Sequence, residues 1–376
     1  MPTVTLYAHR LCHAAATGVG RYVTGLVSSL NTLRSPEINY RVAASRQWGG
    51  NRQCSQQVLH PWPPRKVLHL SWAATNHPKV DRAIGYPDLI HVLYPSTPVP
   101  CRAPVVYTVH DLMPLRSPQW HSRVDRWLFG RATADLCERA ALIVANSRQT
   151  AKDMVDILGV DAGRIRVIPL AVDASFFGER DPARVRRVCA TQGVSPGQFF
   201  VVLGAVSSRK NLSPVLRALR TADFGTHHPK LLVVGPPGRG ADQAKAMVED
   251  LGLSDRVRFT GWLPTDVVRD LLPAAAGLLH PSLDEGFGLT PLEAMASGTP
   301  AAVSNVGALP EVVGDAGLLL APSDSSAWAD AMTRLFNEPS FAEELRRRGL
   351  EHARRFQWTH VAELHLGVHR EVLQLA

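Results

Sequence analysis

The chain has 376 residues, of which 45% are hydrophobic and 20% charged, a size that allows two domains and a composition typical of water-soluble proteins. No apolar run approaches the roughly 20 residues of a membrane-spanning helix, and the first residues, MPTVTLYAHRLCH, lack the apolar core of a secretory signal. Lysine and arginine exceed aspartate and glutamate by 41 − 33 = 8, which favours anionic partners such as nucleotides or phospholipids. Zinc-finger spacings and aromatic RNA-binding signatures are absent, so we expect no nucleic-acid partner.

The cysteines favour a reducing compartment. There are five, an odd number, and none forms a Cys-x-x-Cys pair. A disulfide framework or a zinc site would need paired spacings. We therefore expect a cytoplasmic protein with free thiols.

Short apolar runs alternate with helical patterns along the chain. Residues 3–8 form the first predicted strand, and residues 18–30 form a helix whose apolar side chains recur at helical spacing. The later strands fall into two series. The first is predicted at 87–93, 103–111, 141–147 and 164–170, and the second at 198–206, 230–235, 257–262, 276–282, 299–305 and 317–322.

Near-continuous apolar strands separated by helices predict buried parallel sheets with helical crossovers. The two series predict an α/β protein with two doubly wound, Rossmann-like domains, at residues 1–172 and 173–357. The predicted boundary between the domains lies near the stretch 171–198, which is polar and turn-rich at its ends. Because ligands of open α/β sheets bind beyond the carboxyl ends of the strands, we expect the site in a cleft between the two domains.

The segment TGVGRY puts Gly18 and Gly20 at the entrance of the first helix. It is not Gly-x-Gly-x-x-Gly, because position 23 is valine, and no Gly-x-x-x-x-Gly-Lys-Ser/Thr loop occurs. Nicotinamide-dependent chemistry and P-loop hydrolysis are therefore disfavoured. The two glycines either admit a phosphate or an acceptor close to the backbone, or only permit a tight turn and close helix packing.

The segment TVHD ends a predicted strand of the first domain, which places His110 where a ligand would bind. The alternative is that His110 and Asp111 only cap the next turn. The remaining histidines show no metal-ligand spacing, and no His-Glu-x-x-His or acidic calcium loop occurs. We expect no metal site.

Residues 119–141 contain arginines between aromatic residues. Such a segment can lie on an anionic membrane surface. However, Val124, Leu128, Ala132 and Leu136 recur at helical spacing, which is typical of a stripe that faces the core. We prefer the core stripe and keep peripheral contact with the inner face of the cell membrane as the alternative.

The segment GAVSSRKN follows a strong strand and precedes a helix, so Arg209 and Lys210 lie in a loop at the carboxyl edge of the second sheet. Two cations in this position can hold a diphosphate and stabilise its charge as it leaves. The alternative is a pair of basic residues in solvent.

The segment DEGFGLTPLEAMASGTP (284–300) separates Glu285 and Glu293 by a glycine-rich turn. In one interpretation Thr290 caps a helix, Pro291 takes its first position and Glu293 completes a capping box. This interpretation leaves Glu285 unexplained.

In the second interpretation, glycines at 286 and 288 let an anion approach the backbone closely. The N–H groups near Leu289 and Thr290, at the positive end of a helix, would face a phosphate. The two glutamates would accept hydrogen bonds from sugar hydroxyls. The segment then forms a socket for a sugar joined to a diphosphate.

These segments together resemble the retaining glycosyltransferases of the GT-B fold, the large GT4-type group, over nearly the whole chain. The most specific match is Glu285-Gly-Phe-Gly-x-x-x-x-Glu293, which resembles the family's E-x7-E signature within a similar core at 280–322. GAVSSRKN resembles its phosphate-binding loop. TGVGRY, VHDLMPLRSPQW and ANSRQTAKD resemble blocks of its mannosyltransferase-like branch. Residues 356–373 resemble the helix that crosses back onto the N-terminal domain, which we expect at 358–376.

The resemblance implies a role for each matching residue. Lys210, with Arg209, would bind the donor diphosphate, and Glu285 would contact the transferred sugar. His110 would approach that sugar from the N-terminal domain. The remaining donor contacts would be the ribose hydroxyls at Glu293, the base near Leu263, and phosphate or sugar oxygens at the backbone of Gly18, Gly20, Gly288, Leu289 and Thr290.

Two departures from the family pattern stand out. Many relatives have Asn-Gly-Val-Asp where this chain has Leu-Ala-Val-Asp at 170–173. Some have an arginine directly after the loop glycine, where this chain has Ala205. We expect Arg209 to take over that function.

The resemblance implies an enzyme that moves a hexose from a nucleotide diphosphate sugar to an acceptor hydroxyl, with retention of the anomeric configuration and without a metal ion or other cofactor. GDP-mannose is the leading donor, and a UDP-sugar is the alternative. The acceptor is expected to be a saccharide, a lipid-linked saccharide, a glycolipid or a small molecule, and the product a glycan, a glycolipid or a polysaccharide. Two rival functions are a sugar-nucleotide epimerase and a non-catalytic sugar-nucleotide-binding protein.

Overall fold

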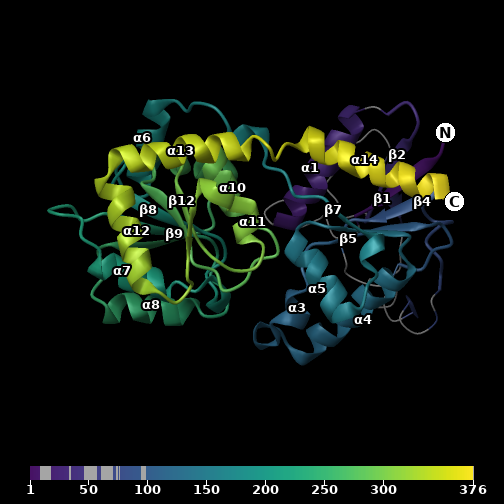
Figure 1. Cartoon of the computed structure of the whole chain (residues 1–376), viewed down its shortest axis with the longest axis horizontal. Coiled ribbons are helices and arrows are strands. Elements are labelled where there is room, and N and C mark those ends of the chain that lie inside the picture. Colours follow the sequence, from purple (N-terminus) through teal and green to yellow (C-terminus); the bar gives the residue numbers. More distant parts are fainter. Residues whose placement is uncertain are drawn as a thin grey trace. The chain divides into compact units, whose positions relative to one another are not determined.

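The computed structural model describes residues 1–8, 18–33, 35–45, 57–60, 71–72, 75, 77–94 and 99–375. The chain forms two compact units (Figure 1). Unit 1 comprises Met1–Ala171 and Gln357–Ala376, and unit 2 comprises Val172–Phe356. No helix of the described ranges has both the length and the apolar content needed to cross a bilayer.

Unit 1 is built on a parallel sheet of seven strands in the order β3-β2-β1-β4-β5-β6-β7. The apolar runs LIHV and VVYTV, which form β4 and β5, are buried at every position, as in sheets covered on both faces. The strands are β1 (Thr3–Tyr7), β2 (Asn39–Ser45), β3 (Gln57–His60), β4 (Leu89–Val92), β5 (Val105–Val109), β6 (Leu142–Ala145) and β7 (Ile165–Val167).

The last helix of the chain packs against the first within unit 1. A Cβ atom at Gly25 would lie 2.2 Å from a ring atom of Trp358, so glycine is what allows the two helices to approach this closely. The α-helices of unit 1 are α1 (Gly18–Leu33), α3 (Met113–Arg116), α4 (Arg123–Arg139), α5 (Arg148–Leu158) and α14 (Trp358–Leu375).

Unit 2 repeats the architecture with six parallel strands in the order β10-β9-β8-β11-β12-β13. The strands are β8 (Phe199–Leu203), β9 (Lys230–Val234), β10 (Val257–Gly261), β11 (Gly277–His280), β12 (Ala301–Ser304) and β13 (Leu318–Leu320). The α-helices are α6 (Pro182–Thr191), α7 (Ser213–Thr221), α8 (Ala241–Asp250), α9 (Thr265–Leu271), α10 (Leu289–Ala296), α11 (Leu309–Val313), α12 (Ser325–Asn337) and α13 (Pro339–Ala353).

The strand order of unit 2 reverses at β8, which pairs with β9 on one side and β11 on the other. In doubly wound folds, ligands bind at such a switch point, beyond the carboxyl ends of the strands. The loops that follow β8 and β11 are therefore the expected binding loops of this unit.

The structure confirms the predicted α/β class and every predicted strand, but it adds two strands that the sequence analysis missed. β2 and β3 lie on one side of β1. In β2 the polar residues Asn39, Arg41 and Ser45 interrupt the apolar pattern. The predicted stripe on α4 is also wrong in part, because Ala132 and Leu136 are buried whereas Val124 and Leu128 are exposed.

Candidate active site

The loop after β8 is shaped around the side chain of Lys210. Gly204 ends the strand with φ +122°, and a Cβ atom there would lie 3.1 Å from Cε of Lys210. The chain then makes a short 3-10 helix, Ser208–Lys210, before α7. Asn211 Nδ2 donates to the carbonyl oxygens of Pro281 (3.2 Å) and Pro322 (2.8 Å), which ties this loop to the one after β11.

The loop after β11 places Glu285 beside Lys210. Oxygen Oε1 of Glu285 lies 2.8 Å from both Lys210 Nζ and Arg209 Nη1. The same oxygen accepts from Ser282 Oγ at 2.9 Å and lies 3.1 Å from His280 Nε2. We call Arg209, Lys210, His280, Ser282 and Glu285 the charged cluster.

Electrostatics keep Glu285 ionised despite its burial. Burial alone would raise the pKa of the Glu285 carboxyl, but Lys210, the His280 hydrogen bond and Arg209 hold that pKa well below its usual range. Burial lowers the pKa of Lys210, and the neighbouring Glu285 opposes this shift. Burial and Lys210 also lower the pKa of His280 to about 4, so this imidazole is neutral near pH 7. Two cations thus share one carboxylate.

Helix α10 begins directly after this loop, and its start differs from the predicted capping box. The N-cap is Gly288, with φ +126°, and no side chain caps the helix. Thr290 is therefore the second helical residue and Glu293 the fifth, so the two cannot form a capping box. Glu293 is buried on α10, while Leu289 and Thr290 lie half-buried in its first turn.

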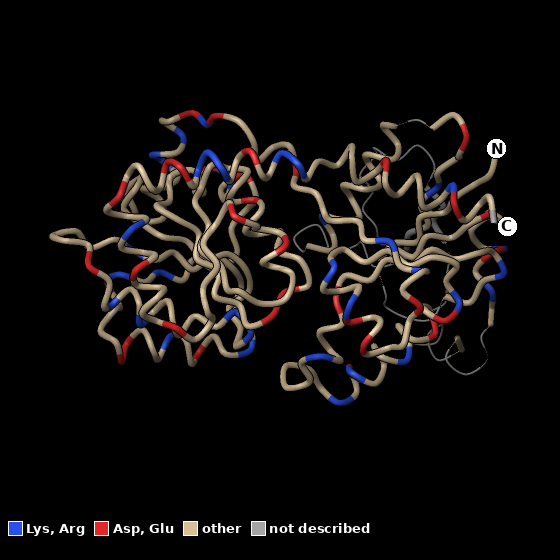
Figure 2. Tube along the Cα trace, viewed as in Figure 1, with Lys and Arg blue, Asp and Glu red and all other residues tan. Residues whose placement is uncertain are grey.

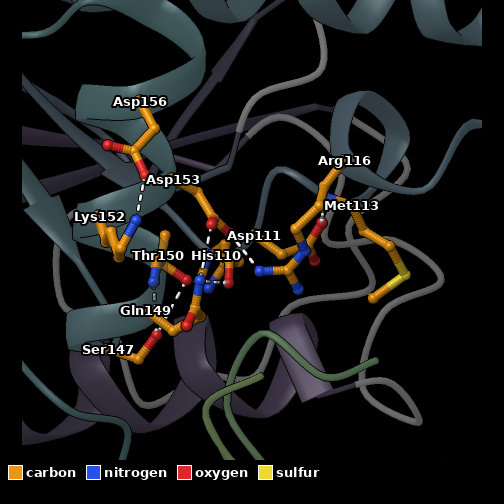
Figure 3. Close-up of polar contacts among 10 residues, drawn as sticks. All are labelled: His110, Asp111, Met113, Arg116, Ser147, Gln149, Thr150, Lys152, Asp153 and Asp156. Carbon is orange, nitrogen blue, oxygen red and sulfur yellow. Dashed lines mark hydrogen bonds and ion pairs between the residues drawn. The ribbon is translucent and has the colours of Figure 1, made fainter. Parts of the chain in front are cut away.

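In unit 1, His110 follows β5 and is held from two sides. Its Nε2 lies 2.9 Å from the carbonyl oxygen of Leu93, and its own carbonyl oxygen accepts from Thr150 Oγ1 at 3.5 Å (Figure 3). Only an N–H can pair with a carbonyl, so the proton is on Nε2 and the buried Nδ1 can accept a hydrogen bond. Nδ1 has no partner among the described residues. Burial lowers the pKa of His110 to about 4.

The capping alternative for TVHD is correct for Asp111 and wrong for the His110 side chain. Asp111 Oδ1 accepts from the backbone N–H of Met113 at 3.0 Å, at the entrance of α3 (Figure 3). The His110 ring instead lies against Tyr22 of α1, with ring centroids 4.8 Å apart. A histidine whose Nδ1 is left to accept a hydrogen bond fits the predicted contact with a sugar hydroxyl.

The remaining predicted residues lie on separate elements. Gly18 and Gly20 stand in the first turn of α1, and Thr17 before them lies outside the described residues. Leu263 is half-buried, two residues after β10. Within unit 2 the structure therefore brings together Arg209, Lys210 and Glu285.

Sequence reasoning missed a second buried polar group, in unit 1, which we call the histidine network. A chain of hydrogen bonds joins five elements of this unit. It runs from Tyr40 OH to His369 Nδ1 (2.9 Å), His369 Nε2 to His91 Nδ1 (2.9 Å), His91 Nε2 to Thr108 Oγ1 (2.8 Å), Thr108 Oγ1 to Tyr22 OH (3.0 Å) and Tyr22 OH to His365 Nε2 (3.3 Å). The available signal was the spacing of four between His365 and His369 on α14.

The nitrogens of His91, His365 and His369 lie within 4.8 Å of one another, a grouping that can ligate a transition metal. Two of these nitrogens are already 2.9 Å apart, which is a hydrogen-bond distance. The hydrogen-bond partners of these imidazoles within the described ranges are hydroxyls and one another, and none is an anion that would balance a buried metal charge. The arrangement fits neutral, hydrogen-bonded imidazoles best.

Comparisons with known proteins agree for both units. The family described as Glycosyltransferase Family 4 matches residues 16–176, and the family described as Glycosyl transferases group 1 matches residues 193–354. The chain is 31% identical over 341 residues to a D-inositol 3-phosphate glycosyltransferase of Acidothermus cellulolyticus, spanning 84% of this chain and 75% of the relative. It is 30% identical over 356 residues to O-antigen chain mannosyltransferase B of Escherichia coli, spanning 91% and 93%.

Solved structures share the whole architecture. The Anabaena protein HepE, crystallised with UDP and glucose, superposes with a TM-score of 0.78 at 19% identity over 99% of this chain and 100% of that one. Sucrose-phosphate synthase from Thermosynechococcus elongatus superposes with a TM-score of 0.79 at 21% identity over 100% of both chains. The sequence relatives and the shared architecture together show that this chain belongs to the GT4-type glycosyltransferases and has the GT-B fold.

Proposed function

We propose that this protein is a retaining hexosyltransferase that uses a nucleotide diphosphate sugar. The observation that carries the proposal is the pairing of Arg209 and Lys210 with a single oxygen of Glu285, each at 2.8 Å, in the loops after β8 and β11. Two cations that share one carboxylate at the switch point of a doubly wound sheet retain capacity for an anion. A diphosphate provides that anion and is also the leaving group of the reaction.

In this mechanism the acceptor oxygen attacks C1 of the donor sugar from the face that the diphosphate leaves. The bond between C1 and the phosphate oxygen breaks, and its electron pair stays on the phosphate. The acceptor proton moves to that phosphate oxygen as the new glycosidic bond forms. Arg209, Lys210 and the N–H groups at the start of α10 would stabilise the charge, without a metal ion.

We assign the donor to the domain at 173–357 and the acceptor to the domain at 1–172, with the crossover helix 358–376. Glu285 and the Nδ1 of His110 would accept hydrogen bonds from the transferred sugar, and Glu293 from the donor ribose. Gly288, Leu289 and Thr290 would meet phosphate oxygens. Gly18, Gly20 and Leu263 complete the proposed donor site.

We favour mannose from GDP-mannose as the transferred sugar, because one relative that matches over 93% of its own length is a mannosyltransferase. A UDP-hexose is the second candidate, because a structure of the same fold holds UDP-glucose. The acceptor would be a saccharide or a lipid-linked saccharide, since the mannosyltransferase relative is named for an O-antigen chain. This reaction fits a cytoplasmic enzyme that meets its acceptor at the membrane.

The test is a thermal-shift panel with GDP, UDP and ADP and their sugar conjugates, followed by product analysis. Binding to the folded state raises the melting temperature in proportion to the logarithm of ligand concentration over Kd. We expect a higher melting temperature with one nucleotide and a larger increase with one of its sugar conjugates. NMR of the product should then show that the transferred sugar keeps the donor's anomeric configuration. The reaction should also proceed in the presence of EDTA. No shift in a folded sample would overturn the proposal. A new sugar nucleotide without a glycosidic bond would indicate an epimerase, and binding without turnover would indicate a non-catalytic protein.

A further inference from the structure

Asn146 holds a buried amide oxygen without a hydrogen-bond partner. Only 3% of the residue is exposed, and Oδ1 has no donor among the residues that the structure describes. Most buried side-chain oxygens in proteins have a partner, and leaving one unpaired costs stability. The last torsion of an asparagine is soft, so its amide can turn towards a ligand without a change in the backbone. A ligand that donates a hydrogen bond would explain the unpaired oxygen.

Asn146 and His110 stand at neighbouring positions on the carboxyl edge of the unit 1 sheet. Strands β5 and β6 pair up to Val109 and Ala145, and the two residues follow directly. Neighbouring strands lie about 5 Å apart. The buried Nδ1 of His110 also has no partner in the described part of the chain. Two unused acceptors therefore lie on the edge where doubly wound sheets bind their ligands.

The loops that carry these two residues are tied together. Ser147, next to Asn146, caps α5 by accepting from the backbone N–H of Thr150 at 3.0 Å. Thr150 Oγ1 in turn donates to the carbonyl oxygen of His110 at 3.5 Å (Figure 3). These contacts fix the backbone on both sides before a ligand binds, which lowers the entropy lost on binding.

The pair of side chains is uncharged near pH 7. An asparagine amide is neutral, and burial lowers the pKa of His110 to about 4. Basic and acidic residues occur along both units (Figure 2), but neither member of this pair belongs to them. A neutral amide and a neutral imidazole match hydroxyl groups and offer no charge to a phosphate. In this they differ from Arg209 and Lys210, which suit an anion.

We propose that the Asn146 amide binds hydroxyl groups of the transferred sugar beside His110. This contact rests on the proposed transferase function, because it adds a residue to the site of the same sugar. The amide oxygen would accept from one hydroxyl, and the NH₂ group can donate to the next hydroxyl of the ring. A site whose buried polar groups are paired only by the correct sugar discriminates against sugars that lack those hydroxyls. Asn146 would thus help to select the sugar.

The test compares the wild type with Asn146→Leu, which replaces the amide by an apolar group of similar shape. Thermal shifts are measured with GDP, UDP and ADP and with their sugar conjugates. Without ligand the variant should melt no lower than the wild type, because it loses an unpaired polar group. The shift with the nucleotide should be unchanged, and the additional shift with its sugar conjugate should shrink.

Kinetics with monodeoxy analogues of the donor locate the hydroxyl. The kcat/KM of Asn146→Leu should be about ten-fold lower than that of the wild type, as expected for one lost hydrogen bond. Removing the contacted hydroxyl from the donor should lower the wild-type kcat/KM by a similar factor and that of the variant no further. Independent, multiplying losses at every ring position would overturn the contact.

Asn337→Leu is the matched control, because its amide is paired. Asn337, the last residue of α12, donates from Nδ2 to the carbonyl oxygen of Asp223 at 2.8 Å. The control should melt below the wild type and keep the sugar-dependent shift.

The outcomes separate this contact from the transferase function. A melting temperature of Asn146→Leu as low as that of the control would show a structural amide and overturn the contact, as would failure of both Asn146→Leu and Asn146→Ala to fold. A normal nucleotide shift with an undiminished sugar-dependent shift would overturn the contact alone. No nucleotide shift in the wild type would overturn the proposed function and this contact together.

Discussion

Each unit has a buried polar cluster that contains histidine, but the two clusters differ in their hydrogen-bond partners and charge. In the charged cluster of unit 2, one carboxylate oxygen of Glu285 faces both Arg209 and Lys210. In the histidine network of unit 1, every hydrogen bond from Tyr40 to His365 joins an imidazole or a hydroxyl to another such group. These groups are neutral and need no counter-ion, whereas two cations on one carboxylate leave positive charge for a further anion.

The difference between the two clusters indicates which buried polar group can bind a ligand. Burial lowers the pKa of histidines in both clusters, so burial and a shifted pKa do not distinguish them. The distinguishing feature is the charge, because the charged cluster holds two cations for one carboxylate and the network holds neutral imidazoles and hydroxyls. We therefore expect substitutions in the charged cluster to affect reaction and binding as well as stability, and substitutions in the network to affect stability alone.

The largest effect should come from Lys210→Ala. If Lys210 stabilises the departing diphosphate, kcat should fall by roughly 10²–10³-fold, the loss typical of one donor aimed at developing charge. Steady-state kinetics with the donor found in the panel would measure it. The control is Lys245→Ala, an exposed lysine of α8. A kcat near the wild-type value would mean that the charged cluster, like the histidine network, contributes to stability and not to catalysis.

The next effect concerns Glu285→Gln, which keeps the shape of the side chain and removes its charge. Two largely buried cations would then face a neutral amide, and we expect the free energy of unfolding at pH 7 to fall by about 2–3 kcal/mol. A nucleoside diphosphate should stabilise the variant more than the wild type, because it restores the missing negative charge. Denaturant titrations with and without the nucleotide measure both effects.

Glu249→Gln, on the exposed face of α8, is the control for loss of one negative charge. Equal nucleotide stabilisation of Glu285→Gln and wild type would mean that the anion does not bind where Glu285 binds. The comparison would then lose its central claim.

Acid should separate the two units. Burial lowers the pKa of His110 to about 4 and of His369 to about 3, and it holds those of His91 and His365 well below 6.5. In unit 2, His280 shows the same kind of shift, to a pKa of about 4. As pH falls below 6.5, these histidines bind protons in the unfolded chain but stay neutral in the folded chain. Stability is thus fully present above pH 6.5 and is lost towards pH 4, by up to about 1.4 kcal/mol per pH unit for each histidine.

Four of these histidines belong to unit 1, so we expect it to lose hydrogen-exchange protection before unit 2 between pH 7 and 5. Glu285, whose pKa is held low, contributes stability that is lost only as pH falls below about 4.5. His369→Gln should reduce the slope of stability against pH by about 1.4 kcal/mol per unit, whereas His228→Gln, in an exposed loop, should not. Equal loss of protection in both units would contradict the assignment of the network as neutral.

The sequence predicted what local patterns encode and missed what distant residues build. Apolar runs such as VVYTV identified the strands, and the spacing of Glu285 and Glu293 singled out the loop after β11 as a candidate binding loop. The network could not be found in this way, because Tyr22 and His365 are 343 positions apart and meet only when α14 packs on α1. Periodicity on α4 showed which side chains share a face, but it could not show which part of that face is covered. Val124 and Leu128, at its beginning, are exposed.

The smallest effect should come from Gly288→Ala, at the start of α10. An L-residue is strained at φ +126°, and its Cβ atom would lie 2.8 Å from Cδ2 of Leu309, so we expect a loss of about 1–2 kcal/mol in unfolding free energy. Because the strain falls on the N–H groups proposed to meet phosphate, the KM for the donor should rise as well.

Gly367→Ala on α14 is the matched control, since its Cβ meets nothing within 4 Å. In a helix interior that change should stabilise unit 1 by about 0.5–1 kcal/mol and leave the KM unchanged. A stability loss in Gly288→Ala without a change in KM would mean that this turn contributes to folding and not to donor binding. The charged cluster would then be the remaining donor contact in this part of unit 2.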